Sequence, residues 1–221
     1  MSIDATLQQL LDDPKAFLTC NALIIYGSPS SASGVKRFVL QATDKSGWQS
    51  VAGGDARNVA LYVLYEEGTF NAQGSGPVST PFDAHYISMR ERDPKSGSWG
   101  DSKDTHYTLP SSGKPRLMVT SKLNGCTFGI GSRSDGGGRL VSHLRPPLDS
   151  AMGVVAGRLA LDTATRTGFA GHKLDVSVMS SAQQNGTVIG QRSGGHWTFY
   201  AQRFQVGRTM DGVISDVQVY H

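Results

Sequence analysis

The stretch from 120 to 144 reads Thr120-Ser-Lys-Leu-Asn-Gly125-Cys126-Thr-Phe-Gly-Ile-Gly-Ser-Arg133-Ser-Asp-Gly136-Gly-Gly-Arg-Leu-Val-Ser-His143-Leu. Its centre, Arg133-Ser-Asp-Gly136, contains an Asp-Gly pair, which is a strong β-hairpin signal. We therefore expect strands over Thr127–Gly131 and Gly138–Ser142. A symmetric hairpin centred between Ser134 and Asp135 places Cys126 directly opposite His143, with both side chains on one face of the sheet.

Period-2 and β-branched segments dominate the chain on both sides of this hairpin. The expected strands are Ala22–Tyr26, Arg37–Thr43, Val59–Tyr65, His85–Arg90, His106–Leu109, Arg116–Leu123, Arg139–Leu144, Leu174–Met179, Thr187–Gly190, Trp197–Val206 and Val213–Tyr220. One helix is expected over the first dozen residues, capped by Ser2 or Asp4 and limited by Pro14. A second helix is expected over Asp149–Ala164. We predict one β-rich α+β domain, 1–221, with a mainly antiparallel sandwich and flanking helices.

Composition narrows the function classes. The net charge of +3 is mild and the basic residues are scattered, which is unlike the basic and aromatic stripes of nucleic-acid binders. We therefore expect no nucleic-acid partner. The sequence has no apolar run long enough for a membrane-spanning helix, and its start lacks the features of a secretory signal. Only Cys20 and Cys126 are present, so we expect free thiols rather than a disulfide framework.

The segment from Thr120 to His143 carries the elements of a thiol enzyme. A cysteine needs a base to become a good nucleophile near neutral pH, and the base needs a third group that fixes its tautomer. Cys126 is the candidate nucleophile, His143 the base and Thr120 the orienting hydroxyl. Gly125 permits a sharp turn before the nucleophile, and the backbone N–H of Cys126 is the candidate oxyanion donor.

Other interpretations of these residues stay open. A lone cysteine is often a small buried hydrophobe, and a lone histidine is often structural. Under that interpretation the chain is a non-catalytic β-sandwich that binds carbohydrate or protein. The remaining histidines lack metal-ligand spacing, and the glycine-rich run lacks the Lys-Ser/Thr ending of a phosphate loop. We expect no metal and no cofactor. Asp93–Asp104, which contains Trp99, is a candidate target-recognition loop.

The order of Thr120, Leu123-Asn-Gly-Cys126 and His143 resembles a family of glutamine deamidases. This family contains the catalytic domain of cytotoxic necrotizing factors, the Burkholderia lethal factor and the CheD-type chemoreceptor deamidases. The resemblance is greatest to the lethal factor and covers roughly residues 117–145. Asn124 stands where the family often has serine, a position that carries none of the chemistry.

The resemblance implies a deamidase-toxin-like β-sandwich and conversion of a specific glutamine in a host protein to glutamate through a cysteine thioester. The expected partner is that host protein, for example a nucleotide-hydrolysing protein or a helicase. The chain is then a monomeric toxin or effector, secreted or translocated into the host cytoplasm without a signal peptide, or otherwise cytoplasmic. A transglutaminase or a cysteine protease with the same Cys–His dyad is the alternative enzyme.

Overall fold

The computed structural model describes residues 2–27, 32–44, 47–69, 76–91, 106–132, 138–145, 159, 166, 173–180, 184–207 and 211–221. Its helices are α1 (Ile3–Asp12) and α2 (Pro14–Cys20). Its strands are β1 (Asn21–Ile25), β2 (Gly34–Ala42), β3 (Trp48–Ser50), β4 (Arg57–Asn58), β5 (Ala60–Glu66), β6 (Phe82–Ile87), β7 (Met89–Glu91), β8 (Tyr107–Leu109), β9 (Leu117–Thr120), β10 (Thr127–Ser132), β11 (Arg139–Arg145), β12 (Lys173–Met179), β13 (Asn185–Ser193), β14 (His196–Val206) and β15 (Gly212–Tyr220).

The two helices meet at Asp13. Ser2 caps α1 by accepting a hydrogen bond from the Ala5 N–H, and α1 ends at Asp12. Asp13 then accepts from the Ala16 N–H at 2.9 Å, and Pro14 opens α2 at its first position. The expected helix is confirmed, but α2 was missed. We interpreted Pro14 only as a stop, whereas a proline that follows an aspartate also starts a helix.

The strands form two sheets, and most of the ladders are antiparallel. The larger sheet has ten strands in the order β1-β5-β2-β6-β9-β13-β14-β15-β3-β4, and the smaller has the order β12-β10-β11-β7 with β8 paired to β11. The parallel ladders described are β1–β5, β6–β9, β15–β3 and β11–β7. The β-rich α+β class is confirmed, and the sheets are mixed rather than purely antiparallel.

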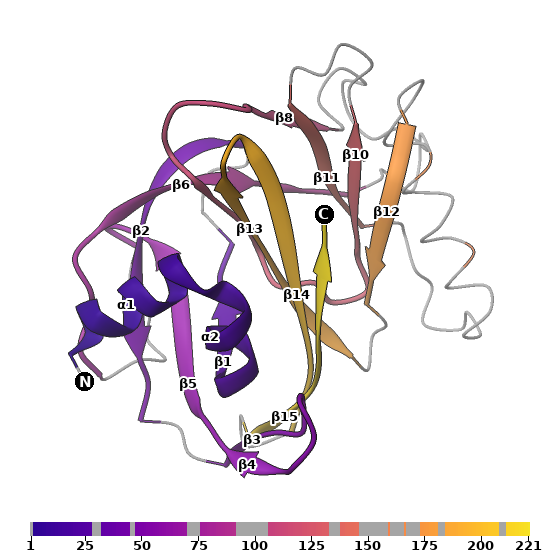
Figure 1. Cartoon of the computed structure of the whole chain (residues 1–221). Helices are drawn as coiled ribbons and strands as arrows, with labels where there is room; N and C mark the ends of the chain where they lie inside the picture. Colours follow the sequence, from indigo (N-terminus) through magenta and orange to yellow (C-terminus); the bar gives the residue numbers. More distant parts are fainter. Residues whose placement is uncertain are drawn as a thin grey trace.

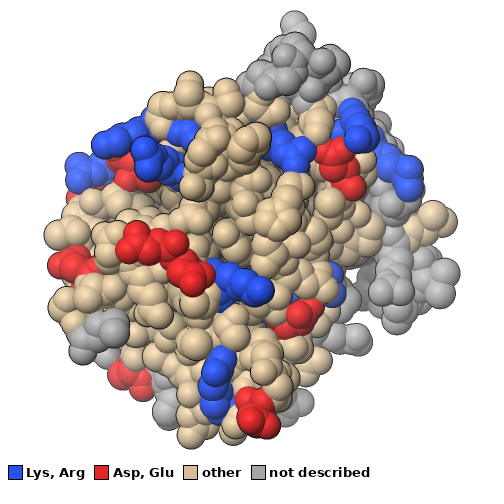
Figure 2. Space-filling view, viewed as in Figure 1, with Lys and Arg blue, Asp and Glu red and all other residues tan. Residues whose placement is uncertain are grey.

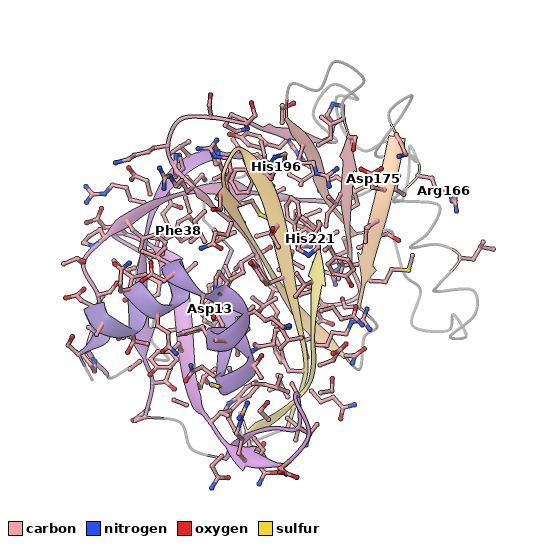
Figure 3. All side chains as sticks on the ribbon, viewed as in Figure 1. Asp13, Phe38, Arg166, Asp175, His196 and His221 are labelled. Carbon is pink, nitrogen blue, oxygen red and sulfur yellow. The ribbon has the colours of Figure 1, made fainter. Side chains whose placement is uncertain are left out.

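The large sheet is the central layer. The helices pack on one of its faces and the small sheet lies toward the other, at the right of Figure 1. In Figure 3 Asp13 marks the helix layer and Asp175 on β12 marks the small sheet. Leu10, Phe17 and Leu18 of the helices join the first core cluster, whereas Phe128 and Ile130 of β10 pack with Phe199 of β14 in the second. This sheet-to-sheet core surrounds the candidate site.

The large sheet curls until β1 reaches the other half of the same sheet. Gln202 on β14 accepts from the Leu23 N–H at 3.0 Å and donates to the Leu18 and Asn21 carbonyls. The Thr187 hydroxyl donates to the Leu23 carbonyl at 2.6 Å. These bonds satisfy the outer edge of β1, which would otherwise keep unpaired backbone groups in the interior. The curl thereby fixes the end of β1, which lines the candidate site.

The strand predictions agree with the structure in most places, but the single strand expected over His85–Arg90 is divided between β6 and β7 of different sheets, and β3 and β4 were missed. Those two are short, and β4 has both residues exposed, so neither has an apolar alternation to reveal it. The expected helix over 149–164 lies, except for Leu159, outside the described residues. Neither described helix is long and apolar enough to cross a membrane. Lys and Arg are interspersed with Asp and Glu on the face shown in Figure 2.

Candidate active site

The hairpin over 120–144 forms, but in a different register from the expected one. His143 pairs with Phe128, and Val141 pairs with Ile130. The prediction that Cys126 and His143 are directly opposite is therefore wrong by two residues. The described β10–β11 ladder begins at Ser132 and Arg139, and a Cβ at the preceding Gly138 would overlap the Leu109 carbonyl of β8.

A polar cluster at the far end of the hairpin holds this register. Arg139 donates to the Ser132 hydroxyl and to the Asp175 carboxylate, each at 2.8 Å, and Ser132 also bonds Asp175. These bonds and the Lys173 ammonium hold the pKa of Asp175 below its usual value against the opposing effect of burial. The cluster joins β10, β11 and β12 at the end of the sheet away from Cys126.

The two-residue shift keeps Cys126 and His143 on the same face, because side chains alternate with a period of two. Cys126 lies just before β10, yet its carbonyl accepts from the Ser180 N–H at 3.0 Å and so continues the β10–β12 ladder. Cys126 and His143 thus become diagonal neighbours across the hairpin, a relation that places Cα atoms about 7–8 Å apart. That separation lets the side chains approach one another.

Thr120 fixes the tautomer of His143. The Thr120 hydroxyl donates its single proton to the Ile87 carbonyl at 2.7 Å, and the same oxygen lies 2.7 Å from Nδ1 of His143. Because that proton is already used, the oxygen must accept from an Nδ1–H. Nε2 of His143 is therefore the nitrogen with a lone pair. The expected hydrogen bond between Thr120 and His143 is present.

The unprotonated nitrogen of His143, Nε2, is buried, and the ring is in its neutral form. Nε2 has no hydrogen-bond partner among the described residues, and the residue is 1% exposed. Burial, and secondarily the charge of Arg145, lowers the pKa of His143 to about 3. The ring is neutral at physiological pH, so its resting form can accept a proton but does not form an imidazolium–thiolate pair.

The thiol of Cys126 shares a sheet face with this ring, and it contacts groups of other residues. Its Sγ lies 3.4 Å from the Asn124 carbonyl and 3.5 Å from Sδ of Met89. Met89 pairs with His143 across the parallel β7–β11 ladder and is half-buried. Cys126 itself is only 1% exposed, and it is one of the residues that line a cavity.

That cavity has a volume of about 390 Å³ and opens where the two sheets meet. Cys126 and Met89 line it together with the end of β1 and the connection that follows β9. Its polar lining includes Tyr26, Lys122 and Arg145. A side chain entering here meets the sulfur. His143 and Thr120 are buried and are not among the residues that line the cavity.

The candidate oxyanion donor is turned away from the cavity in this conformation. The Cys126 N–H points to the Ser180 hydroxyl, at a long 3.4 Å, and the same hydroxyl is 3.4 Å from the Cys126 carbonyl. Gly125 has φ +66°, which agrees with the sharp turn expected before the nucleophile. Ser180 thus competes for the N–H, through a bond that is weak at this length.

Sequence reasoning missed the partners that long-range pairing supplies. The Ile87 carbonyl reaches Thr120 because β6 and β9 are parallel neighbours, and Met89 reaches Cys126 because β7 joins β11. No local signal marks either contact. The expected recognition loop Asp93–Asp104 with Trp99 lies outside the described residues. Cys20 and Cys126 are free thiols, as expected, and the described residues contain no cluster able to hold a metal ion.

Replacing Thr120 with Val should allow the neutral His143 ring to populate both tautomers instead of the Nδ1–H form alone. The change leaves the Ile87 carbonyl and the Nδ1–H buried and unpaired, at about 1–3 kcal/mol each, so we expect a loss of about 2–6 kcal/mol in unfolding free energy. Histidine ¹⁵N chemical shifts should change from a single Nδ1–H form to a mixture. Thr120→Ser keeps the hydroxyl and should restore the Nδ1–H form; an unaltered tautomer in the Val variant would contradict the assignment.

Comparisons with known proteins add little to this geometry. No family model matches the chain, and a search of curated proteins finds no match. Among solved structures, the fold is similar to that of the C-terminal domain of CNFy from Yersinia pseudotuberculosis, with 9% identity and a TM-score of 0.43 over 100% of this chain and 99% of that chain. A likeness of this size does not establish chemistry, so the function is inferred from the site itself.

Proposed function

We propose that the chain is a cysteine-dependent protein-glutamine deamidase, with Cys126 as nucleophile, His143 as acid and base, and Thr120 as the positioning residue. The observation that supports this most is the hydrogen-bonded series from His143 through Thr120 to the Ile87 carbonyl. It leaves an unpaired, unprotonated Nε2 on the face that Cys126 shares. His85 is likewise buried with an Nε2 that has no partner among the described residues, so what distinguishes His143 is that its Nε2 belongs to a ring on the sheet face that carries Cys126.

The first half of the reaction forms a thioester. The Cys126 thiol turns from the Asn124 carbonyl, gives its proton to Nε2 of His143, and the sulfur attacks the glutamine carboxamide carbon. The tetrahedral intermediate collapses as the Nε2 proton passes to the departing nitrogen, and ammonia leaves. The imidazolium exists only transiently, because burial disfavours it. Each proton transfer is expected to contribute about 10²–10⁴-fold to the rate.

The second half hydrolyses the thioester. Nε2 takes a proton from a water molecule, the resulting hydroxide attacks the thioester carbon, and the sulfur departs with the proton returned by His143. The products are glutamate and a restored thiol, so the scheme requires no cofactor. The Cys126 N–H can stabilise the oxyanion once it leaves the Ser180 hydroxyl, whose 3.4 Å bond gives little resistance.

The proposal also includes the domain organisation, oligomeric state, substrate and delivery of the protein. Residues 1–221 act as a single catalytic domain and as a monomer, and the substrate is a host protein that carries the target glutamine. Delivery is by secretion or translocation into the host cytoplasm. The mild and mixed surface charge is consistent with a protein target rather than a nucleic acid.

A mass-spectrometric survey tests the reaction. Eukaryotic cell lysate is incubated with the wild-type protein or with Cys126→Ala, and tryptic peptides are searched for replacement of a glutamine NH₂ by OH. We expect one or a few sites that depend on Cys126. Peptides joined to amines would identify a transglutaminase, and new chain termini would identify a protease. Identical spectra for the two proteins would exclude all three.

The burial of Cys126 favours a second candidate, a non-catalytic β-sandwich that binds a ligand. Its sulfur lies in an apolar cluster with Phe128 and Ile87, as a structural cysteine would. The two candidates differ in thiol reactivity. A deamidase requires Cys126 to react with small electrophiles through the cavity and to depend on His143, whereas a structural cysteine reacts slowly and independently of that ring.

A further inference from the structure

The cavity that leads to Cys126 is electropositive. The cations Lys122 and Arg145 line it, and no acidic residue is among its described lining residues. The charge of Arg145 also acts on His143, because after burial it is the second cause of the lowered pKa of that residue. Tyr26 and Asn124 supply neutral polar groups at the same wall. A substrate segment that enters this cavity therefore meets positive charge on its way to the thiol.

Lys122 is held in place by its backbone. Its N–H donates to the Ile25 carbonyl at 2.9 Å, and the next residue, Leu123, exchanges backbone hydrogen bonds with Gly186 at 2.7 and 3.0 Å. The side chain is half-buried. Its ammonium makes no ion pair with any residue in the described part of the chain, unlike Lys36 and Lys173, which each face a carboxylate. The charge therefore belongs to the cavity wall and is available to a ligand.

We propose that this site selects a glutamine with an acidic side chain within about two residues of it, an inference that rests on the proposed deamidase function. Lys122 precedes Cys126 by four residues, so their Cα atoms lie at most about 14 Å apart. Two residues of an extended substrate span about 7 Å, and the reach of a lysine and a carboxylate side chain covers the remainder. Lys122 is then the specificity-determining residue.

Charged thiol reagents test this field without any knowledge of the substrate. Iodoacetate carries a negative charge, whereas aminoethyl methanethiosulfonate carries a positive one. The rate at each cysteine is followed by mass spectrometry of its peptide, and the exposed Cys20 in the same molecule corrects for the intrinsic reactivity of each reagent. We expect Cys126 to favour the anionic reagent relative to Cys20. In Lys122→Gln this preference should fall about three- to tenfold, and Lys122→Glu should lower it further.

Lys173→Gln is the matched control. It removes the same charge from β12, at the Ser132 end of the hairpin rather than the Cys126 end, and should leave the preference unchanged. Added salt should reduce the preference of the wild type toward that of Lys122→Gln. An equal preference in wild type and Lys122→Gln would overturn the inference. If neither reagent modified Cys126, both the inference and the deamidase proposal would fall.

Glutamine peptides separate the two proposals further. Peptides that carry Glu or Lys beside one glutamine are compared for ammonia release, with Lys122→Glu as the reversed-charge enzyme. Faster release from the Glu peptide, with the order reversed in the variant, is expected. Equal ammonia release from the Glu and Lys peptides would support the deamidase proposal and contradict the selection for an acidic neighbour. If Cys126 preferred the anionic reagent but no glutamine were converted to glutamate in peptides or lysate, the positive charge at the cavity would be supported. The deamidase proposal would then be contradicted.

Discussion

Replacing His143 with Asn should lower the rate of alkylation at Cys126, and of glutamine deamidation, by about 10²–10⁴-fold. Asparagine places its amide nitrogen near the position of Nδ1, so it can still donate to the Thr120 hydroxyl. What it removes is Nε2, the nitrogen that has no partner in the structure. The fold and the Thr120 contact are retained, and the base is lost.

Iodoacetamide labelling followed at the two cysteines measures the first effect. Cys20 is exposed on α2, far along the chain from the hairpin, and should react equally in both proteins. Val141→Ala, a change in the same strand that leaves the ring in place, controls for loosened packing. If Cys126 reacts at the same slow rate in wild type and His143→Asn, the ring does not activate the sulfur and the binding-module interpretation holds.

The hairpin shows what local sequence could and could not provide. The alternation around Phe128 and Ile130 and the Asp-Gly signal gave the strands and their inward face. In the observed register Gly138 packs against the β8 carbonyl, and Asp175 joins Arg139 to Ser132. Those contacts come from β8 and β12, which are distant in the chain, so a symmetric-turn argument missed them. The period of two nevertheless kept Cys126 and His143 on one face.

The sequence indicated which residues form the candidate site, but it did not indicate how deeply they are buried or which residues surround them. Cys126, His143 and Thr120 were identified by chemical type and order, and the Thr120 contact is present. The depth of the thiol was not foreseen, because burial here results from the meeting of two sheets. Met89, half-buried and 3.5 Å from the sulfur, would have to move if the proposed substrate approached the sulfur from its side. A flexible thioether is suited to that movement.

Acid should destabilise the wild-type protein more than His143→Asn. Burial holds the pKa of His143 near 3 in the folded state, below the ordinary 6.5 that it regains on unfolding. As pH falls through 6.5, the unfolded chain binds a proton at this residue while the folded chain does not. The contribution is therefore complete above about pH 6.5 and is lost progressively toward pH 3. Its full extent corresponds to about 5 kcal/mol of unfolding free energy.

The difference between the two proteins isolates this residue. His85 also has a pKa lowered by burial, and Asp175 has one lowered by its partners, so both contribute to the acid response of the wild type. Both are unchanged in His143→Asn, and their contributions cancel. We expect the gap in unfolding free energy, measured by urea denaturation, to narrow by several kcal/mol between pH 7 and pH 4. A constant gap would mean that His143 titrates normally and is therefore hydrated, which would contradict a neutral, buried base behind Cys126.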